Sequence, residues 1–70
     1  MKQNIPSICG NPAVAVGDTI KILALDDPYS KDYPGKTGTV TLIDDANTLH
    51  GTWGGLGVLP DVDAFMVVPA

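Results

Sequence analysis

The side chains best suited to binding a partner lie in one short stretch of the sequence. This stretch interleaves carboxylates with aromatic rings, and it contains Asp26, Asp27, Tyr29, Asp32 and Tyr33. Tyrosine rings are frequent anchors at protein interfaces, and carboxylates can pair with the lysines of a bound peptide. The stretch therefore predicts a docking loop for a protein segment that contains proline or lysine. The alternative is that both rings pack on the body of the domain with their hydroxyl groups in water.

The same types of residue do not form a pattern typical of catalysis or metal binding. The acids in this stretch lack the alternating oxygen ligands and the terminal glutamate of an EF-hand. His50 falls among threonines on the solvent face of a predicted strand, and Cys9 has no base nearby in the sequence that would activate its thiol. No two groups form a convincing acid and base couple. We therefore expect no catalytic residue, no metal, no cofactor and no enzymatic activity.

The charged residues are of two types only. All eight acids are Asp and all four bases are Lys, which gives a formal net charge of -4. Asp favours turns, whereas Glu favours helix interiors, so this choice favours an all-β chain. A negatively charged chain lacks the Lys and Arg that displace counterions from a phosphate backbone. Direct nucleic-acid binding is therefore not expected, and the expected partner is a protein.

The length of the chain limits its sources of stability. Seventy residues allow one domain, which buries only about 60% of its unfolded surface. A single cysteine excludes an internal disulfide, so the core must suffice or a homo-oligomer must form. The first 16 residues contain no unbroken apolar stretch, and a lone thiol suits a reducing compartment. We expect a cytoplasmic protein with no membrane association.

Short apolar runs separated by Pro, Gly and Asp indicate a small all-β fold. They predict strands at residues 18–25, 37–44, 48–53, 56–59 and 64–68, with a single helical turn at 60–63. Strands this short, joined by tight turns, hide their edges by bending the sheet into a barrel. The predicted fold is therefore a five-stranded antiparallel barrel over residues 14–70. Residues 1–13 are predicted to form a short N-terminal arm, which Ile5 or Ile8 could hold in place.

Alternation within the first two strands predicts the centre of the core. Ile20 and Ile22 share one face of the first strand. Val40 and Leu42 share one face of the second, and Gly38 precedes them where a barrel would need a kink.

The third strand predicts both a core residue and a gap. Leu49, Gly51 and Trp53 share one face, so Trp53 is assigned to the core, with a binding platform as the alternative. His50 faces the other way, and it joins Trp53 as a secondary candidate for partner contact. Gly51 would leave a space beside Trp53 that another group or a ligand fills. The pair Gly54-Gly55 permits a tight reversal into the next strand.

Two runs resemble parts of SH3-like barrels. Ala24-Leu25-Asp26-Asp27 with Tyr29 is similar to the start of an SH3 loop, and Gly57-Val58-Leu59-Pro60 before Phe65 is similar to the approach to the final strand. Trp53 departs from the peptide-binding pattern, in which a whole hairpin separates the tryptophan from that glycine. The opening Gly-Asp-x-Ile with a later Gly-x-Val also resembles KOW-type barrels, whose partners are RNA or polymerase.

A longer pattern, over residues 17–65, resembles a family of small domains of unknown function from phages and other bacterial mobile elements. This resemblance implies a fold and an origin in a bacterial host cell, but no activity. Gly51 stands where the family usually has an apolar β-branched residue, and Gly54-Gly55 replaces an Asp-Asn-Gly turn. The matching elements are Asp26-Asp27-Pro28, Pro34-Gly35, Gly38-Thr39-Val40, Ile43-Asp44-Asp45, Thr48-Leu49-His50, Trp53, Leu59-Pro60, Asp63 and Phe65.

Two functions remain open from the sequence. The first is a non-catalytic interaction module that docks on a protein through the loop from Tyr29 to Tyr33, with Asp26 and Pro60 beside it and the adjoining sheet face. The second is a phage-encoded inhibitor of a host defence system. Such an inhibitor would act as an acidic mimic of nucleic acid or, as an oligomer, would sequester a signal nucleotide, for which four lysines are a poor supply.

Overall fold

The chain folds into short strands joined by turns. The structure is a computed structural model that describes residues 2–26 and 32–69, and within those ranges it contains no helix. The strands are β1 (Asn4–Ile5), β2 (Val14–Ala15), β3 (Thr19–Ala24), β4 (Thr37–Ile43), β5 (Leu49–Gly51), β6 (Gly54–Val58) and β7 (Ala64–Val68).

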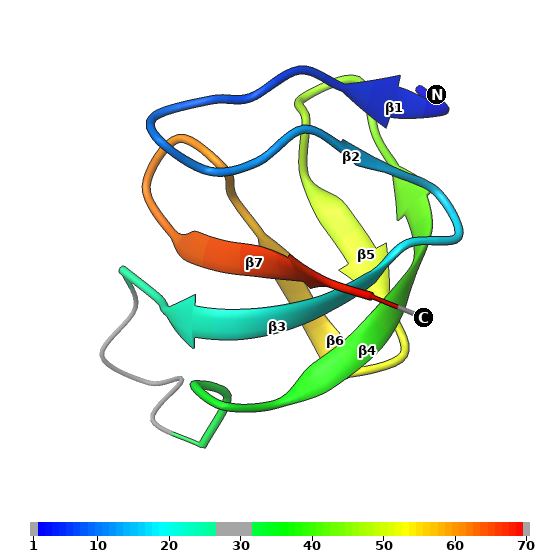
Figure 1. The fold of residues 1–70 in the computed structure, drawn as a ribbon. Coiled ribbons are helices and arrows are strands. Elements are labelled where there is room, and N and C mark those ends of the chain that lie inside the picture. The colour runs from blue at the N-terminus through cyan, green and yellow to red at the C-terminus, as the bar shows by residue number, and fades with distance from the viewer. Residues whose placement is uncertain (1, 27–31, 70) are drawn as a thin grey trace.

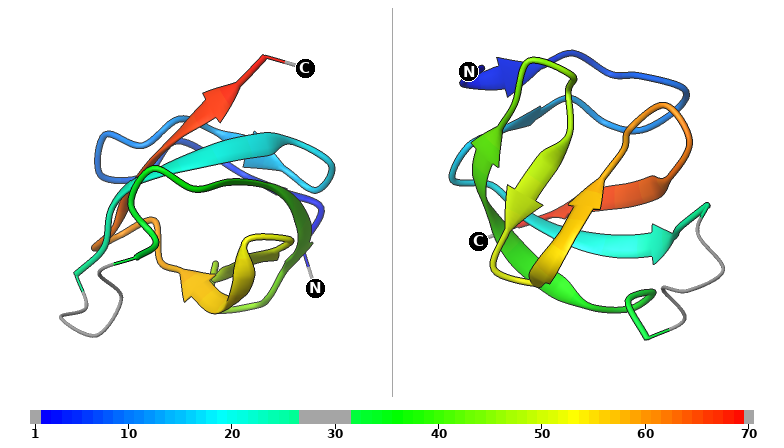
Figure 2. Two further views of the ribbon diagram at one scale, coloured as in Figure 1. Left: turned by 90° about the horizontal axis from the view of Figure 1, so that it is seen from below. Right: turned by 180° about the vertical axis from the view of Figure 1, so that it is seen from behind.

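The strands form two antiparallel sheets. The larger has the order β6-β5-β4-β3-β7, and β1 pairs with β2 in a separate sheet (Figure 1). The larger sheet curves strongly around the core (Figure 2). Its edge strands, β6 and β7, do not pair with each other in the described residues, so the barrel is not closed. The prediction of an all-β fold is confirmed, and the sheet is an open one.

Strand β3 supplies the centre of the core because its side chains alternate. Ile20 and Ile22 are fully buried, whereas Lys21 and Leu23 face outward. The register with β7 shifts between Ile22 and Ala24, and beyond this bulge Ala24 is exposed as well. Two consecutive outward positions at the end of β3 therefore widen the exposed surface there.

A second bulge changes which residue of β4 enters the core. The register between β4 and β5 shifts between Val40 and Leu42. Beyond this point Ile43 is fully buried and Leu42 is only half-buried. The assignment of Val40 to the core is confirmed. The assignment of Leu42 is wrong, because the bulge exchanges inward and outward positions and Ile43 faces the core instead.

Trp53 fills the space beside Gly51. Its side chain is buried, and a Cβ atom on Gly51 would lie 2.4 Å from Cζ3 of the indole and 2.3 Å from the carbonyl oxygen of Thr39. The core assignment of Trp53 is confirmed, whereas the predicted gap does not exist because the indole already occupies it.

The reversal between β5 and β6 falls at Thr52 and Trp53, and Gly54 follows it with a φ of 140°. The expected turn at Gly54-Gly55 therefore begins two residues earlier.

Residues 2–17, here called the N-terminal strap, lie across one end of the larger sheet (Figures 1 and 2). The strap contains β1 and β2, and Lys2 N–H donates to the carbonyl of Ile43 at 2.9 Å. Ile5 and Val14 from the strap are part of the buried core. The strap is therefore packed on the domain, and Ile5 contributes to holding it as expected.

Candidate protein-binding site

A carboxylate joins the end of β3 to the segment before β7. Asp63 Oδ1 accepts a hydrogen bond from the N–H of Asp26 at 2.7 Å, and Asp63 Oδ2 accepts one from the N–H of Leu59 at 2.9 Å. The carbonyl of Leu59 in turn accepts from the N–H groups of Val62 and Asp63 at 3.1 and 2.7 Å. The turn at residues 59–63 is thus closed on itself and fixed to the residue that follows β3.

The side chain of Asn11 fixes the same turn from its other side. Asn11 is buried, and its Nδ2 donates to the carbonyls of Pro60 and Asp63, both at 2.7 Å. Its Oδ1 accepts from the N–H of Phe65 at 3.0 Å. A carboxamide that accepts from one residue and donates to the residue two positions before it makes the two contacts that the C=O and N–H of a single residue in a parallel neighbouring strand would make. Asn11 therefore acts as a short substitute for a strand at the start of β7.

Large aliphatic side chains are exposed around this fixed turn. The exposed fractions are 52% for Val62, 47% for Leu23 and 39% for Leu59. Asp61 is exposed next to Val62 in the sequence, and Asp26, three residues after Leu23, is exposed as well. We call this surface the β3–β7 corner, and it consists of Leu23, Asp26, Leu59, Asp61 and Val62.

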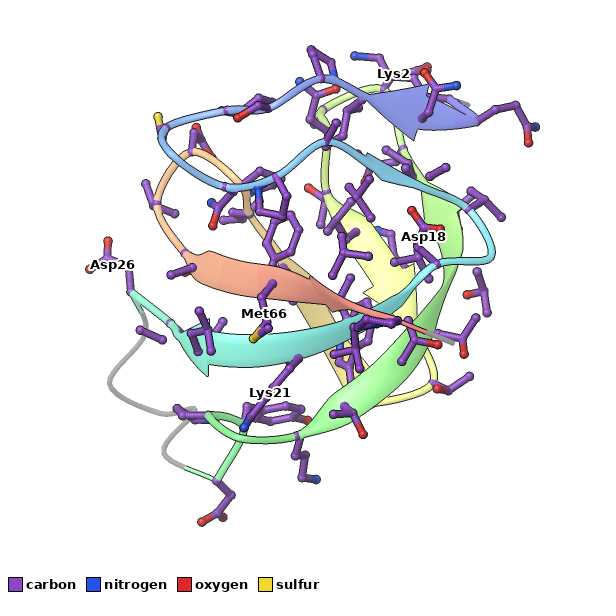
Figure 3. All side chains as sticks on the ribbon, viewed as in Figure 1. Lys2, Asp18, Lys21, Asp26 and Met66 are labelled. Atoms are coloured by element: carbon purple, nitrogen blue, oxygen red, sulfur yellow. The ribbon has the colours of Figure 1, made fainter. Side chains whose placement is uncertain are left out.

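The outer face of the sheet continues this surface along both strands. Met66 on β7 is the direct partner of Lys21 on β3, and both side chains are exposed (Figure 3). Leu23 lies two residues from Lys21 along β3, so it is a diagonal neighbour of Met66. Met66 therefore adds one apolar position of the adjoining sheet face to the surface that includes Leu23, and both are open to solvent beside Lys21.

The residues predicted for docking are only partly brought together. Asp26 lies in the β3–β7 corner, and Asp32 is exposed. Tyr33 is half-buried and packs against the core, with Lys36 Nζ 5.0 Å from the centroid of its ring. Pro60 is fully buried, so its ring forms part of the interior instead of the docking surface. Asp27 and Tyr29 lie outside the described residues.

His50 faces solvent as predicted, but it has a partner that the sequence did not indicate. Its Nε2 lies 3.1 Å from Oδ2 of Asp44. Asp44 Oδ1 accepts from the N–H groups of Ala46 and Thr48, which holds the turn between β4 and β5. The hydrogen bond with His50, followed by that from Thr48, lowers the pKa of Asp44 below its usual value. The pair of His50 and Asp44 is exposed, and it stabilises the turn between β4 and β5.

Residues 2–26 and 32–69 contain no group of three or more His, Cys, Asp or Glu side chains placed to hold a metal ion. Nor do these ranges contain a helix long and apolar enough to span a bilayer.

Comparison with protein families assigns the chain to one of them. A family model described as a domain of unknown function, DUF4314, matches residues 13–68. The chain belongs to the DUF4314 family. A search of curated proteins and a search of solved structures each found no match. The resemblance to a family without an assigned function is therefore confirmed.

The DUF4314 region contains the whole β3–β7 corner but only part of its support. Leu23, Asp26 and residues 59–63 fall within residues 13–68, whereas Asn11 precedes them. The sequence did not indicate a role for Asn11, because a lone asparagine between Gly10 and Pro12 is typical of a turn. Its burial depends on contacts with residues about fifty positions away, and no local pattern reports such contacts.

Proposed function

We propose that this chain is a non-catalytic protein-interaction module that docks on its partner through the β3–β7 corner. The observation that carries the proposal is the exposure of three large aliphatic side chains, Leu23, Leu59 and Val62, around one fixed turn. Single exposed aliphatic residues are ordinary, but apolar residues gathered at one place and bordered by polar groups are typical of contact sites.

The charge of the corner indicates the chemistry of the partner. Asp26 and Asp61 are exposed beside the aliphatic side chains, and the chain as a whole carries a formal charge of -4. Complementary charge speeds association and disfavours wrong partners. A protein segment that combines lysine or arginine with apolar side chains fits this surface best.

The hydrogen bonds beneath the corner favour binding because they order it in advance. Asp63 uses both carboxylate oxygens, and Asn11 contributes two bonds to the same turn and one to Phe65 in β7. A surface already held in one conformation loses less conformational entropy when a partner binds. The predicted role of the loop from Tyr29 to Tyr33 stays a prediction.

We also propose that the curved sheet is an SH3-like barrel. The order β6-β5-β4-β3-β7 supports this arrangement, because β7, the last strand in the chain, pairs with β3, the first strand of this sheet in the chain. The strong curvature of the sheet is in keeping with it (Figure 2). A barrel of this kind would present its connecting turns, including the β3–β7 corner, as the variable surface for partners.

Affinity capture with matched variants tests the docking proposal. The wild-type protein, the double variant Leu23→Ser with Val62→Ser, and the control Val16→Ser are each used to retain proteins from a bacterial lysate. Val16 is 37% exposed and lies outside the corner, so it is a comparable aliphatic residue elsewhere. At least one protein should be retained by the wild type and the control and reduced roughly tenfold or more by the double variant, because the two serines remove apolar contact area and place hydroxyl groups in the interface.

Folding must be checked before the capture result is interpreted. Circular dichroism and thermal unfolding should show that both variants keep the wild-type fold, since all the substituted side chains are exposed. A folded double variant that retains the same proteins in the same amounts as the wild type would exclude the β3–β7 corner as the docking surface.

A further inference from the structure

A groove lies in the N-terminal strap, away from the β3–β7 corner. Its volume is about 430 Å³, within the usual range for sites that hold a ligand group. Ile5 and Val14 are directly opposite each other in β1 and β2, and they line the groove with Pro6 and Ala13. Ile5 and Val14 are buried in the core and close the bottom of the groove, so the apolar side chains that a ligand can reach are those of Pro6 and Ala13 at its open rim.

Two polar side chains also line this groove. Asp18 follows β2, and its Oδ2 accepts from the N–H of Ala15 at 2.9 Å. Its Oδ1 has no hydrogen-bond partner in the parts of the chain that are described. Asn4 contributes a carboxamide that has no partner within those parts either. The groove thus offers one carboxylate oxygen and one amide to a ligand.

We propose that this groove binds a lysine or arginine side chain of a partner protein. Such a side chain has an apolar stem and a cationic head, and it can lay the stem along an apolar surface while the head meets a carboxylate. Pro6 and Ala13 match the stem, and Asp18 matches the head. A purely apolar ligand would leave the carboxylate without a partner, and an anion would be repelled by it.

The placement of the groove makes it a contact separate from the β3–β7 corner. Asp18 precedes β3 and Asp26 follows it, so the two sites lie at opposite ends of that strand (Figure 3). Six residues of strand separate them by about 20 Å. A protein that reaches both ends of β3 could place a basic side chain in the groove while it covers the corner. The groove proposal depends on neither the corner nor a known partner.

Nuclear magnetic resonance with defined probes tests the proposal directly. The ¹⁵N-labelled protein is titrated with N-acetyl-lysine methylamide and, separately, with N-acetyl-norleucine methylamide, which has the same stem without the ammonium group. The lysine probe should shift the amide signals of Val14, Ala15 and Asp18 and should bind roughly tenfold more tightly than the norleucine probe. Equal binding of the two probes, or no shift of these signals by the lysine probe, would overturn the proposal.

Two variants with the same change in net charge distinguish binding in the groove from attraction by the overall negative charge of the protein. Asp18→Asn keeps an oxygen that can accept from Ala15, so the local turn is retained, but it should weaken the lysine probe roughly tenfold. Asp45→Asn removes an exposed charge in the turn between β4 and β5, outside both proposed sites, and should leave the probe unaffected. Equal loss in both variants would show attraction by net charge alone and would contradict a specific site.

A third comparison tests the source of the cation. A short peptide amide with lysine between two valines is compared with butylamine, which carries the ammonium group and stem alone. Tighter binding of the peptide is expected, since the backbone on both sides of the lysine can contact Pro6 and Ala13 at the rim. Tighter binding of butylamine would instead assign the groove to a small free amine.

Discussion

Replacing Asn11 by Ala should strongly destabilise the domain. The change removes three hydrogen bonds from a buried side chain and leaves the N–H of Phe65 and two carbonyls without their partners. Each buried group left unpaired costs about 1–3 kcal/mol, and water at the edge of the turn restores part of this, so we expect a loss of about 2–4 kcal/mol. A domain of 70 residues has about 4–10 kcal/mol of stability in total.

Thermal and urea unfolding, followed by circular dichroism, measure this loss. For a domain of this size the expected decrease in Tm is roughly 10–30 °C. The control is Asn4→Ala, which changes an exposed asparagine of the same strap and should alter the free energy of unfolding by less than about 0.5 kcal/mol. An Asn11→Ala variant as stable as the Asn4→Ala variant would refute the role assigned to Asn11.

The variant Asn11→Asp separates the hydrogen bonds from the volume of the side chain. A carboxylate has the same shape but cannot donate to the carbonyls of Pro60 and Asp63. A protonated carboxyl group can donate one bond, so burial against two carbonyls raises the pKa of the new group in the folded state. Stability should therefore rise as the pH falls towards the ordinary range of a carboxyl group. A constant difference from wild type between pH 7 and pH 4 would contradict this reasoning.

Three further predictions concern β5 and its flanking turns. Trp53→Ala should cost about 3–5 kcal/mol and largely unfold the domain, which the loss of the near-ultraviolet signal and of cooperative melting would show. Gly51→Ala should lower Tm severely because its Cβ would overlap the indole and a backbone carbonyl, whereas Gly55→Ala, with open space around it, should melt close to wild type. His50→Ala should raise the pKa of Asp44 towards its usual value of 3.8, as carboxyl chemical shifts can measure. Because the pKa of Asp44 is lowered in the folded state, its stabilising contribution is present above pH 3.8 and is lost as the pH falls through the lowered value.

Local patterns in the sequence were sufficient for the strands but not for the bulges. The last strand, at residues 64–68, agrees with β7, because Pro60 and Pro69 mark clear limits on either side. The exchange of Leu42 for Ile43 in the core was not predictable, since a bulge depends on the register between two strands. Alternation within one strand contains no information about its neighbour.

The candidate site was predicted less well than the fold. The loop pattern predicts Asp26 at the site and Pro60 beside it at the surface, but no local pattern indicates Leu23 as a site residue. Burial of Pro60 results from packing of the whole turn beneath Asn11, and exposure of Leu23 follows from the position of β7. Both depend on contacts between distant parts of the chain, which composition and periodicity do not report.

The bonds of Asn11 also determine when the domain can finish folding. They join positions separated by 49, 52 and 54 residues, whereas the hairpins β3–β4, β4–β5 and β5–β6 join neighbouring strands. As the chain leaves the ribosome, those hairpins can form before residues 60–65 have emerged, and long loops close later than short ones. The bonds of Asn11 therefore form after those hairpins, although Asn11 is synthesised before every strand of the larger sheet.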